Sequence, residues 1–173
     1  MVIRKKQLFA AGLILLLAVA AGIFLWYRLR PTDENRIRAR FAKLTGLVAK
    51  NGKEGAIPAA GKAKEAAGLF SDKCTFSVNG LDWMSGPFSR KNLSGQIFRS
   101  RAMFNSLALS LDLLELDIDP DKGTARVFLT ATLTGTLRDG KTVREVRELE
   151  SKLTRTDDGW LFENFKIREL IKK

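Results

Sequence analysis

The sequence predicts an α+β protein in which helices come first and antiparallel strands follow. Three observations lead to this class. An uncharged, mainly apolar run covers residues 7–27. Between residues 33 and 104 apolar residues recur at helical spacings, and from residue 106 onward they alternate with polar ones as in strands. The 173 residues are therefore expected to form an N-terminal membrane segment, residues 1–30, and one compact domain, residues 31–173.

The apolar run has the length of a transmembrane helix. At about 1.5 Å per residue, residues 8–27 would span roughly 30 Å of hydrocarbon. Trp26 and Tyr27 stand at its far end, where amphipathic rings favour the headgroup level. We therefore expect a short cytoplasmic tail followed by an uncleaved signal anchor. A cleaved signal peptide is the alternative, because residues 18–20 read Ala-Val-Ala, a small-x-small pattern that signal peptidase accepts.

The orientation of this segment is less directly encoded, because cations flank it on both sides. Their count alone would keep the C-terminal side in the cytoplasm. The short tail with Arg4, Lys5 and Lys6 instead has the layout of a signal anchor that exports the domain. We expect a single-pass protein of the bacterial inner membrane with a periplasmic domain. The single cysteine, Cys74, has no internal disulfide partner and does not decide the compartment.

The formal charge of +11 and the pI near 10.1 raise the question of nucleic-acid binding, which the charge distribution argues against. Residues 1–30 contribute +5, residues 31–64 another +5, and the remainder only +1. The excess forms a basic collar beside the predicted span, where anionic headgroups attract cations by about 1 kcal/mol each. A solvated helix face is the other interpretation of these cations. We expect contact with a membrane and no nucleic-acid partner.

Three helices are predicted in the first half of the domain. The first begins at Asp33, with Thr32 as N-cap and an apolar stripe through Ile37 and Phe41, and ends near residues 51–52. The second follows Pro58 and runs to about residue 70. The third is capped by Ser89 and places Leu93, Ile97, Arg101 and Phe104 on one side.

The second half is predicted as a bent antiparallel meander, preceded by a short strand over residues 74–78 and an apolar loop over residues 81–88. Leucines from residue 107 to 113 share one phase, and the apolar series then continues from residue 114 on the other phase. Such a slip indicates a β-bulge. Turns at residues 119–123, 138–141 and 157–159 then separate four consecutive strands.

This order of elements resembles the nuclear-transport-factor-two-like cone fold, shared with ketosteroid isomerases and SnoaL-type cyclases. The resemblance covers roughly residues 33–173 and includes four local phrases: Phe70-Ser71-Asp72, the Ser89 helix with Arg99 and Arg101, the hairpin Asp121-Lys122-Gly123-Thr124-Ala125-Arg126-Val127, and Asp157-Asp158-Gly159-Trp160-Leu161-Phe162. It implies a cone-shaped domain of three helices packed on a strongly curved, mainly antiparallel sheet that encloses a conical pocket. A fold of this kind implies a pocket and not a reaction.

The residue types argue against the reactions known in that family. Its isomerases use a pocket tyrosine with a carboxylate, and its cyclases generally use aspartate with histidine. This chain has no histidine, and its only tyrosine is Tyr27 in the predicted span. The strand carboxylates are expected on the solvated face, and the thiol of Cys74 is expected to be buried and structural; these carboxylates are Asp112, Asp117, Glu148 and Glu150. No metal or cofactor is expected.

Two functional hypotheses from different classes follow. The first is a membrane-anchored, non-catalytic interaction module that forms a homodimer or joins a protein complex, as a scaffold of the bacterial cell envelope. The alternative is a pocket for a small apolar ligand or lipid, with isomerase-like or cyclase-like chemistry as one form of it. The candidate lining residues of such a pocket are Trp83, Met84, Phe88, Arg101, Phe104 and Phe128. Arg99 and Arg101 could hold an anionic group, but a solvent-facing position is favoured for both.

Overall fold

The computed structural model describes residue 19 and residues 32–78 and 86–168. The chain separates into two compact units, residues 1–32 and 33–173, and the described elements all belong to the second. In chain order these elements are α2 (Asp33–Val48), β1 (Lys50–Asn51), α3 (Ala56–Ala67), β2 (Phe70–Val78), β3 (Gly86–Phe88), α4 (Arg90–Ala102), β4 (Phe104–Asp119), β5 (Thr124–Leu137), β6 (Thr142–Thr156) and β7 (Gly159–Arg168).

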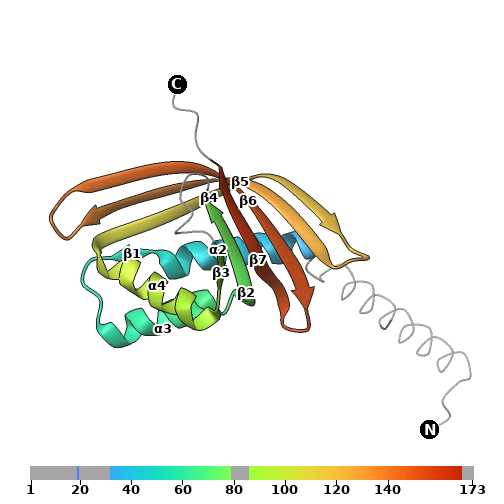
Figure 1. The fold of residues 1–173 in the computed structure, drawn as a ribbon, viewed down its shortest axis with the longest axis horizontal. Helices are drawn as coiled ribbons and strands as arrows, with labels where there is room; N and C mark the ends of the chain where they lie inside the picture. Colours follow the sequence, from blue (N-terminus) through green and yellow to red (C-terminus); the bar gives the residue numbers. More distant parts are fainter. Residues whose placement is uncertain (1–18, 20–31, 79–85, 169–173) are drawn as a thin grey trace, which may run out of the picture. The chain divides into compact units, whose positions relative to one another are not determined.

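The described strands form one sheet in the order β1-β4-β5-β6-β7-β2-β3 (Figure 1). Strands β4 to β7 are a continuous antiparallel meander, as the sequence predicts. Strand β2 joins β7 in parallel, and β3 then pairs with β2 in the antiparallel sense. The predicted α+β class, with three helices on a curved and mainly antiparallel sheet, is confirmed.

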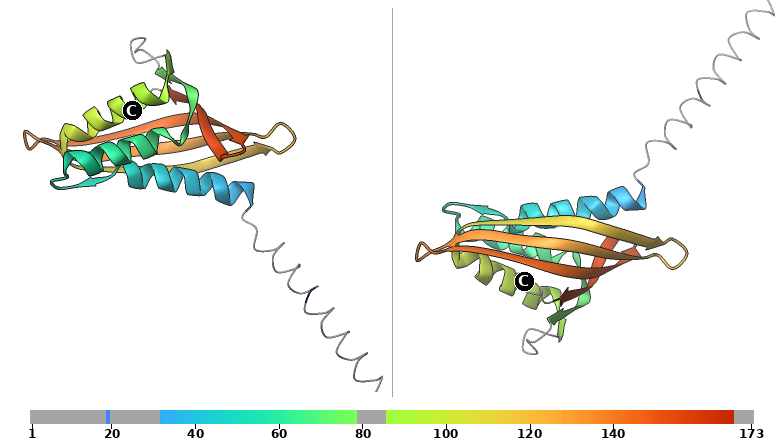
Figure 2. Two further views of the ribbon diagram at one scale, coloured as in Figure 1. Left: turned by 90° about the horizontal axis from the view of Figure 1, so that it is seen from below. Right: turned by 90° about the horizontal axis from the view of Figure 1, so that it is seen from above.

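The three helices lie side by side on one face of this sheet, which we call the inner face (Figure 2). Helix α2 buries the stripe Ile37, Phe41 and Leu44, as its periodicity predicts. Its first residue, Asp33, accepts a hydrogen bond from Trp160 Nε1 at 3.1 Å and another from Arg155 at 3.2 Å. The start of α2 is thereby fixed to the β6–β7 hairpin.

Aromatic rings fill the space between the helices and the inner face. Phe162 is fully buried, and its ring lies 4.9 Å from that of Phe41 and 5.2 Å from those of Phe70 and Phe165. Phe76 stacks on Phe165 at 5.6 Å. Ring contacts of this kind add about 0.5–1.5 kcal/mol each to the free energy gained by burying apolar area. In this interior, where the cone fold would offer a pocket, side chains occupy the space.

The phase slip in β4 is a β-bulge, as predicted. The register with β5 shifts between Leu113 and Glu115, which leaves Leu114 67% exposed. The apolar residues on both sides of the bulge, including Leu111 and Leu116, pack against the core. The extra residue thus keeps both halves of a long strand facing inward.

The second helix and the strand after it differ from the prediction. Helix α3 covers Ala56–Ala67, about three residues earlier than expected at both its start and its end. Gly68 ends it by donating its N–H to the carbonyl of Lys64. The carbonyl of Leu69 then accepts from Phe162 N–H at 3.0 Å, so the chain joins β7 instead of continuing as a helix. The third helix begins after Ser89, whose hydroxyl accepts from Asn92 N–H at 3.2 Å, as predicted.

The predicted membrane anchor falls on residues that the structure does not describe, apart from residue 19. Among the described residues, no helix combines the length and the apolar character that a membrane crossing requires. The cytoplasmic tail, the span and the domain boundary at residue 30 stay predictions.

Candidate functional site

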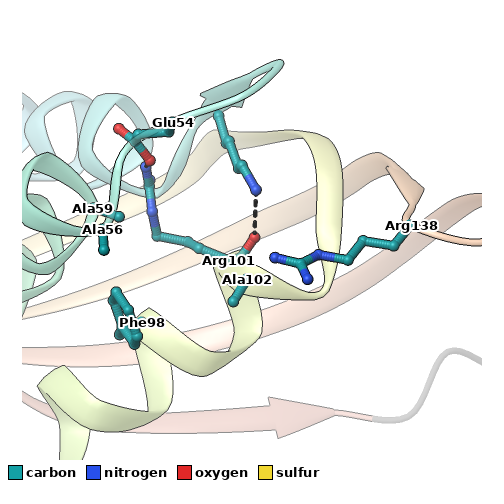
Figure 3. Close-up of a pocket in the computed structure, with 8 residues that line it drawn as sticks. Glu54, Ala56, Ala59, Phe98, Arg101, Ala102 and Arg138 are labelled. Carbon is teal, nitrogen blue, oxygen red and sulfur yellow. Dashed lines mark hydrogen bonds and ion pairs between the residues drawn. The ribbon is translucent and has the colours of Figure 1, made fainter.

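A pocket of about 150 Å³ lies where the start of α3, the end of α4 and the β5–β6 hairpin meet (Figure 3). We call it the α3–α4 pocket. One half of its lining is ionisable and the other half is apolar. Its lining residues are Lys50, Glu54, Ala56, Ala59, Phe98, Arg101, Ala102 and Arg138.

Arg101 forms the most buried part of the lining, with a side chain only 2% exposed. Its Nη1 donates to the carbonyls of Leu47, Val48 and Ala49, the last two at 2.8 Å. The first two are the last carbonyls of α2 and the third follows it directly, and a helix leaves such carbonyls without partners of its own. Its Nη2 donates to Glu54 Oε2. Arg101 therefore closes the end of α2 and joins it to the segment before α3.

The solvent-facing position favoured for Arg101 from the sequence is wrong. Leu93 and Arg101 are the buried residues of α4, because they lie on the same face of the helix. A guanidinium is tolerated there because carbonyls and a carboxylate receive its hydrogen bonds. Arg99, two residues before Arg101, is exposed and donates to the carbonyl of Gly95.

Glu54 is held as a carboxylate. Its Oε1 lies 2.8 Å from Lys62 Nζ, and Arg101 binds its other oxygen. The hydrogen bond from Lys62 and, to a lesser extent, that from Arg101 lower the pKa of Glu54, although partial burial opposes them. A carboxylate with a lowered pKa is a weak base, so Glu54 is poorly suited to accept a proton from a substrate.

Lys50 caps the other helix end in the pocket. Its Nζ donates to the carbonyl of Arg101 at 3.2 Å and to that of Phe104 at 2.5 Å, where α4 passes into β4. Two of the three ammonium donors are used in these bonds. Two helix C-termini, those of α2 and α4, thus meet at the pocket, and each receives a cation, as helix dipoles favour.

Besides the third donor of Lys50, two groups in the lining keep unused donors. Arg101 Nε is buried and has no hydrogen-bond partner among the described residues, but it has almost no accessible surface through which a ligand could reach it. Arg138 is exposed, and Figure 3 shows its guanidinium pointing toward the Arg101–Ala102 backbone. Its backbone N–H donates to the carbonyl of Met103 at 3.1 Å, which ties the β5–β6 hairpin to the end of α4. The donors of Lys50 and Arg138 suit an acceptor group brought by a ligand.

The rest of the lining is apolar and small. Phe98 is half-buried, and Ala56, Ala59 and Ala102 present only methyl groups to the pocket. A dry cavity of about 150 Å³ is large enough for a benzene ring. The pocket can therefore hold a molecule of about that size next to a set of hydrogen-bond donors.

The other residues predicted as pocket lining do not gather here. Trp83 and Met84 lie outside the described residues. Phe88 belongs to β3 and packs on Phe76 at 5.5 Å. The ring of Phe104 covers Gly135, where an added Cβ would come within 2.8 Å of it.

Phe128 was predicted as pocket lining and is placed on the opposite side of the sheet. It alternates along β5 with Val127 and Leu129, which are 0% and 1% exposed on the inner face. Alternate residues of a strand point to opposite faces, so Phe128 lies on the outer face. Phe128 therefore does not contribute to the lining of the α3–α4 pocket.

The strand carboxylates considered as acids or bases lie at exposed or ion-paired positions, and the one cysteine lies in the core. Asp112, Asp117 and Glu148 are exposed, as predicted, whereas Glu150 is half-buried and lies 3.5 Å from Arg126. Cys74 is fully buried, and this burial raises the pKa of its thiol to about 12. The thiol is therefore protonated at neutral pH, as expected for a structural cysteine. In the described part of the chain, no three His, Cys, Asp or Glu residues gather into a group that could hold a metal ion.

A second pocket, of about 210 Å³, lies at the β4–β5 turn. Its charged lining residues are exposed or pair within the chain: Lys122 binds Asp119 at 2.8 Å, Arg126 lies beside Glu150, and Lys152 lies 3.1 Å from Glu163. Ala125 is the one apolar residue in its lining, whereas half of the lining of the α3–α4 pocket is apolar.

Comparison with known proteins identifies a domain family. Residues 59–166 match the family model described as the SnoaL-like domain, which is more than half of the chain. No curated protein matches the sequence.

Solved structures share the fold at low sequence identity. A candidate aromatic ring hydroxylase from Novosphingobium aromaticivorans superposes with a TM-score of 0.64 at 14% identity, covering 81% of this chain and 90% of that one. An NTF2-like protein with a cystatin-like fold from the same organism gives 0.57 at 17% identity, with 90% of each chain covered. A candidate calcium/calmodulin-dependent protein kinase II association domain from Xanthomonas campestris gives 0.56 at 15% identity, with 80% and 89% covered.

Proposed function

The chain belongs to the family of SnoaL-like domains, and we propose that it is a ligand-binding member that holds a small molecule in the α3–α4 pocket. The observation that carries the proposal is the pocket itself, an open volume of about 150 Å³ in which the exposed guanidinium of Arg138 and the third ammonium donor of Lys50 lie beside an apolar wall. An acceptor group and a small apolar body would together use both halves of this lining.

The pocket residues support the binding of a ligand without a chemical reaction. Glu54 is the carboxylate of the pocket, and its lowered pKa makes it a poor base. The chain has no histidine, and Cys74 is buried as a protonated thiol. These residues supply hydrogen bonds and charge to a ligand, and they lack a nucleophile paired with a base.

The alternative hypothesis from the sequence, a pocket protein, is therefore preferred to the envelope scaffold. The pocket between α3 and α4 supports it, although it lies outside the interior where the cone fold would offer a pocket. The homodimer or envelope complex stays a prediction.

The test of the proposal is native mass spectrometry of the full-length chain as purified. We expect a reproducible small-molecule adduct at one per chain. The variant Ala59→Phe, which fills the pocket, should lose the adduct, and the matched variant Ala60→Phe should keep it, because Ala60 is exposed on the same helix and does not line the pocket. An adduct that survives in Ala59→Phe would contradict the proposal.

We further propose that residues 7–27 attach the domain to the bacterial inner membrane, with the domain on the periplasmic side. The support is the apolar length of the segment and, for the orientation, the short tail with Arg4, Lys5 and Lys6 in front of it. After cell fractionation and carbonate extraction, the full-length chain should remain with the membranes. The double substitution of Leu15→Lys with Leu16→Lys should release it, and a wild-type chain found in the soluble fraction would contradict this proposal.

A further inference from the structure

We infer that the ligand of the α3–α4 pocket is a small organic monoanion, with one carboxylate-type group and an apolar body of about one ring. This inference rests on the proposed function and adds the chemistry of the ligand to it. Three properties of the pocket carry it: its charge, its free donors and its apolar wall.

The charge of the lining is positive. Lys50, Arg101 and Arg138 face a single carboxylate, that of Glu54, which Lys62 also binds from outside the pocket lining. Arg101 is 2% exposed, so water does little to compensate its charge. A cationic, partly dehydrated site favours an anion over a neutral molecule of the same shape.

The free donors point to one acceptor group of the carboxylate type. Lys50 keeps the third of its ammonium donors. Arg138 adds a planar fork of N–H groups, which matches a carboxylate in bidentate geometry. These donors come from β1 and the β5–β6 hairpin, so a single anionic group would join two elements that are far apart in the sequence.

The apolar wall argues for an organic anion over an inorganic one. Phe98 and three alanines form half of the lining, and they offer nothing to the oxygens of a phosphate or sulfate. The same surfaces bury a hydrocarbon body at a gain of about 25 cal/mol per Å² of apolar area. The volume of about 150 Å³ limits that body to roughly one aromatic ring.

Arg138 is the residue on which the specificity for an anion can be tested cleanly. Arg101 and Lys50 also close helix ends, so replacing them would change the fold as well as the pocket. Arg138 is exposed on the hairpin, and its backbone, not its side chain, bonds to Met103. Its side chain can be changed at little cost in stability.

The experiment is isothermal titration calorimetry of the full-length chain with three probes of different charge. Benzoate is the small organic anion, benzamide its neutral isostere, and inorganic phosphate the anion without an apolar body. We expect benzoate to bind at one site per chain, benzamide at least about tenfold more weakly, and phosphate without measurable heat.

Variants then assign the site. Arg138→Gln should weaken benzoate binding at least about tenfold, whereas Arg144→Gln, an exposed arginine on the other strand of the same hairpin, should leave it unchanged. Ala59→Phe should abolish binding of benzoate. An equal loss in Arg138→Gln and Arg144→Gln would overturn the inference, because it would reduce the effect to general surface charge.

The remaining outcomes separate this inference from the proposed function. Benzamide binding as tightly as benzoate, and lost in Ala59→Phe, would overturn the anion inference while supporting a ligand pocket. Phosphate binding as tightly as benzoate would also overturn it. No heat from any probe at millimolar concentration would overturn the inference, and a retained adduct that Ala59→Phe removes would still support the proposed function.

Discussion

Helix α4 packs Leu93 into the aromatic interior and, about two turns later, places Arg101 in the wall of the α3–α4 pocket. Around Leu93 the neighbours are rings and methyl groups that fill the space under the sheet. Around Arg101 they are helix-end carbonyls, a carboxylate and a small volume that side chains leave open. The same helix thus stabilises the fold at one end and forms the pocket at the other.

The difference between these two regions shows where the domain has room for a ligand. In the interior, the burial of apolar area and the ring contacts already stabilise the fold. A ligand would add little further free energy there. In the pocket half of the lining is ionisable, and Lys50 and Arg138 keep donors that the rest of the described chain does not use. Four variants sharpen or break this comparison.

The largest effect is expected in the interior, from Phe162→Ala. Phe162 is 0% exposed and contacts the rings of Phe41, Phe70 and Phe165, so its truncation leaves a cavity. The free energy of unfolding should fall by about 4 kcal/mol in urea denaturation. Leu114→Ala, at an exposed position of β4, should change it by less than about 0.5 kcal/mol. A loss below about 1 kcal/mol for Phe162→Ala would mean that the interior is not tightly packed.

Arg101→Met should be the next most destabilising change, by about 3 kcal/mol in the same measurement. It removes the partner of the carbonyls of Leu47, Val48 and Ala49 at the end of α2, and one of the two cations on Glu54. Arg99→Met, on the exposed side of α4, is the matched control and should be nearly neutral. Equal stability of the two variants would show that the buried guanidinium does not hold α2 and α3 together.

An intermediate effect is expected from Glu54→Gln, and it should depend on pH. The pKa of Glu54 is lowered in the folded state from its ordinary value near 4.5, so the unfolded chain binds the extra proton first as the pH falls. The stabilisation from its charge is complete above that value and is lost as the pH falls through the folded pKa. Urea denaturation from pH 7 to 3 should show a smaller loss in Glu54→Gln than in the wild type. If the free energy of unfolding fell equally with pH in both proteins, the charge of Glu54 would not stabilise the folded state.

The smallest change is expected from Ser89→Ala at the opposite end of α4. The Ser89 hydroxyl accepts from Asn92 N–H, and loss of such an N-cap typically costs about 1 kcal/mol. Ligand affinity should be unchanged, whereas Arg138→Gln should lower affinity at nearly unchanged stability. If Ser89→Ala weakened benzoate binding as much as Arg138→Gln, the two ends of α4 would not be separate in function.

Much of the fold follows from local sequence patterns. The stripe through Ile37 and Phe41, the cap at Ser89 and the phase slip at Leu114 each encode one element, and each lies where the pattern places it. The early end of α3 does not follow from such a pattern. It depends on the pairing of Leu69 with Phe162, a contact between residues more than ninety positions apart.

The pocket was only partly predictable, because its residues come from distant segments. Of the six predicted lining residues, Arg101 lies in it, whereas Lys50, Glu54, Phe98 and Arg138 were not assigned to it. One signal was present in the sequence. An arginine in the apolar stripe of α4 must find acceptors if it is buried, and helix-end carbonyls or a carboxylate are the groups that supply them. Which carboxylate does so is decided by tertiary packing.

The most direct test of the account is amide chemical-shift mapping by NMR on the full-length chain titrated with benzoate. The account predicts that the largest shifts cluster at residues around the α3–α4 pocket, with Ala59, Phe98, Ala102 and Arg138 among them, and that Arg138→Gln needs at least about tenfold more benzoate to produce them. Shifts centred on Phe41 and Phe162 in the aromatic interior, or spread evenly over the surface, would contradict it.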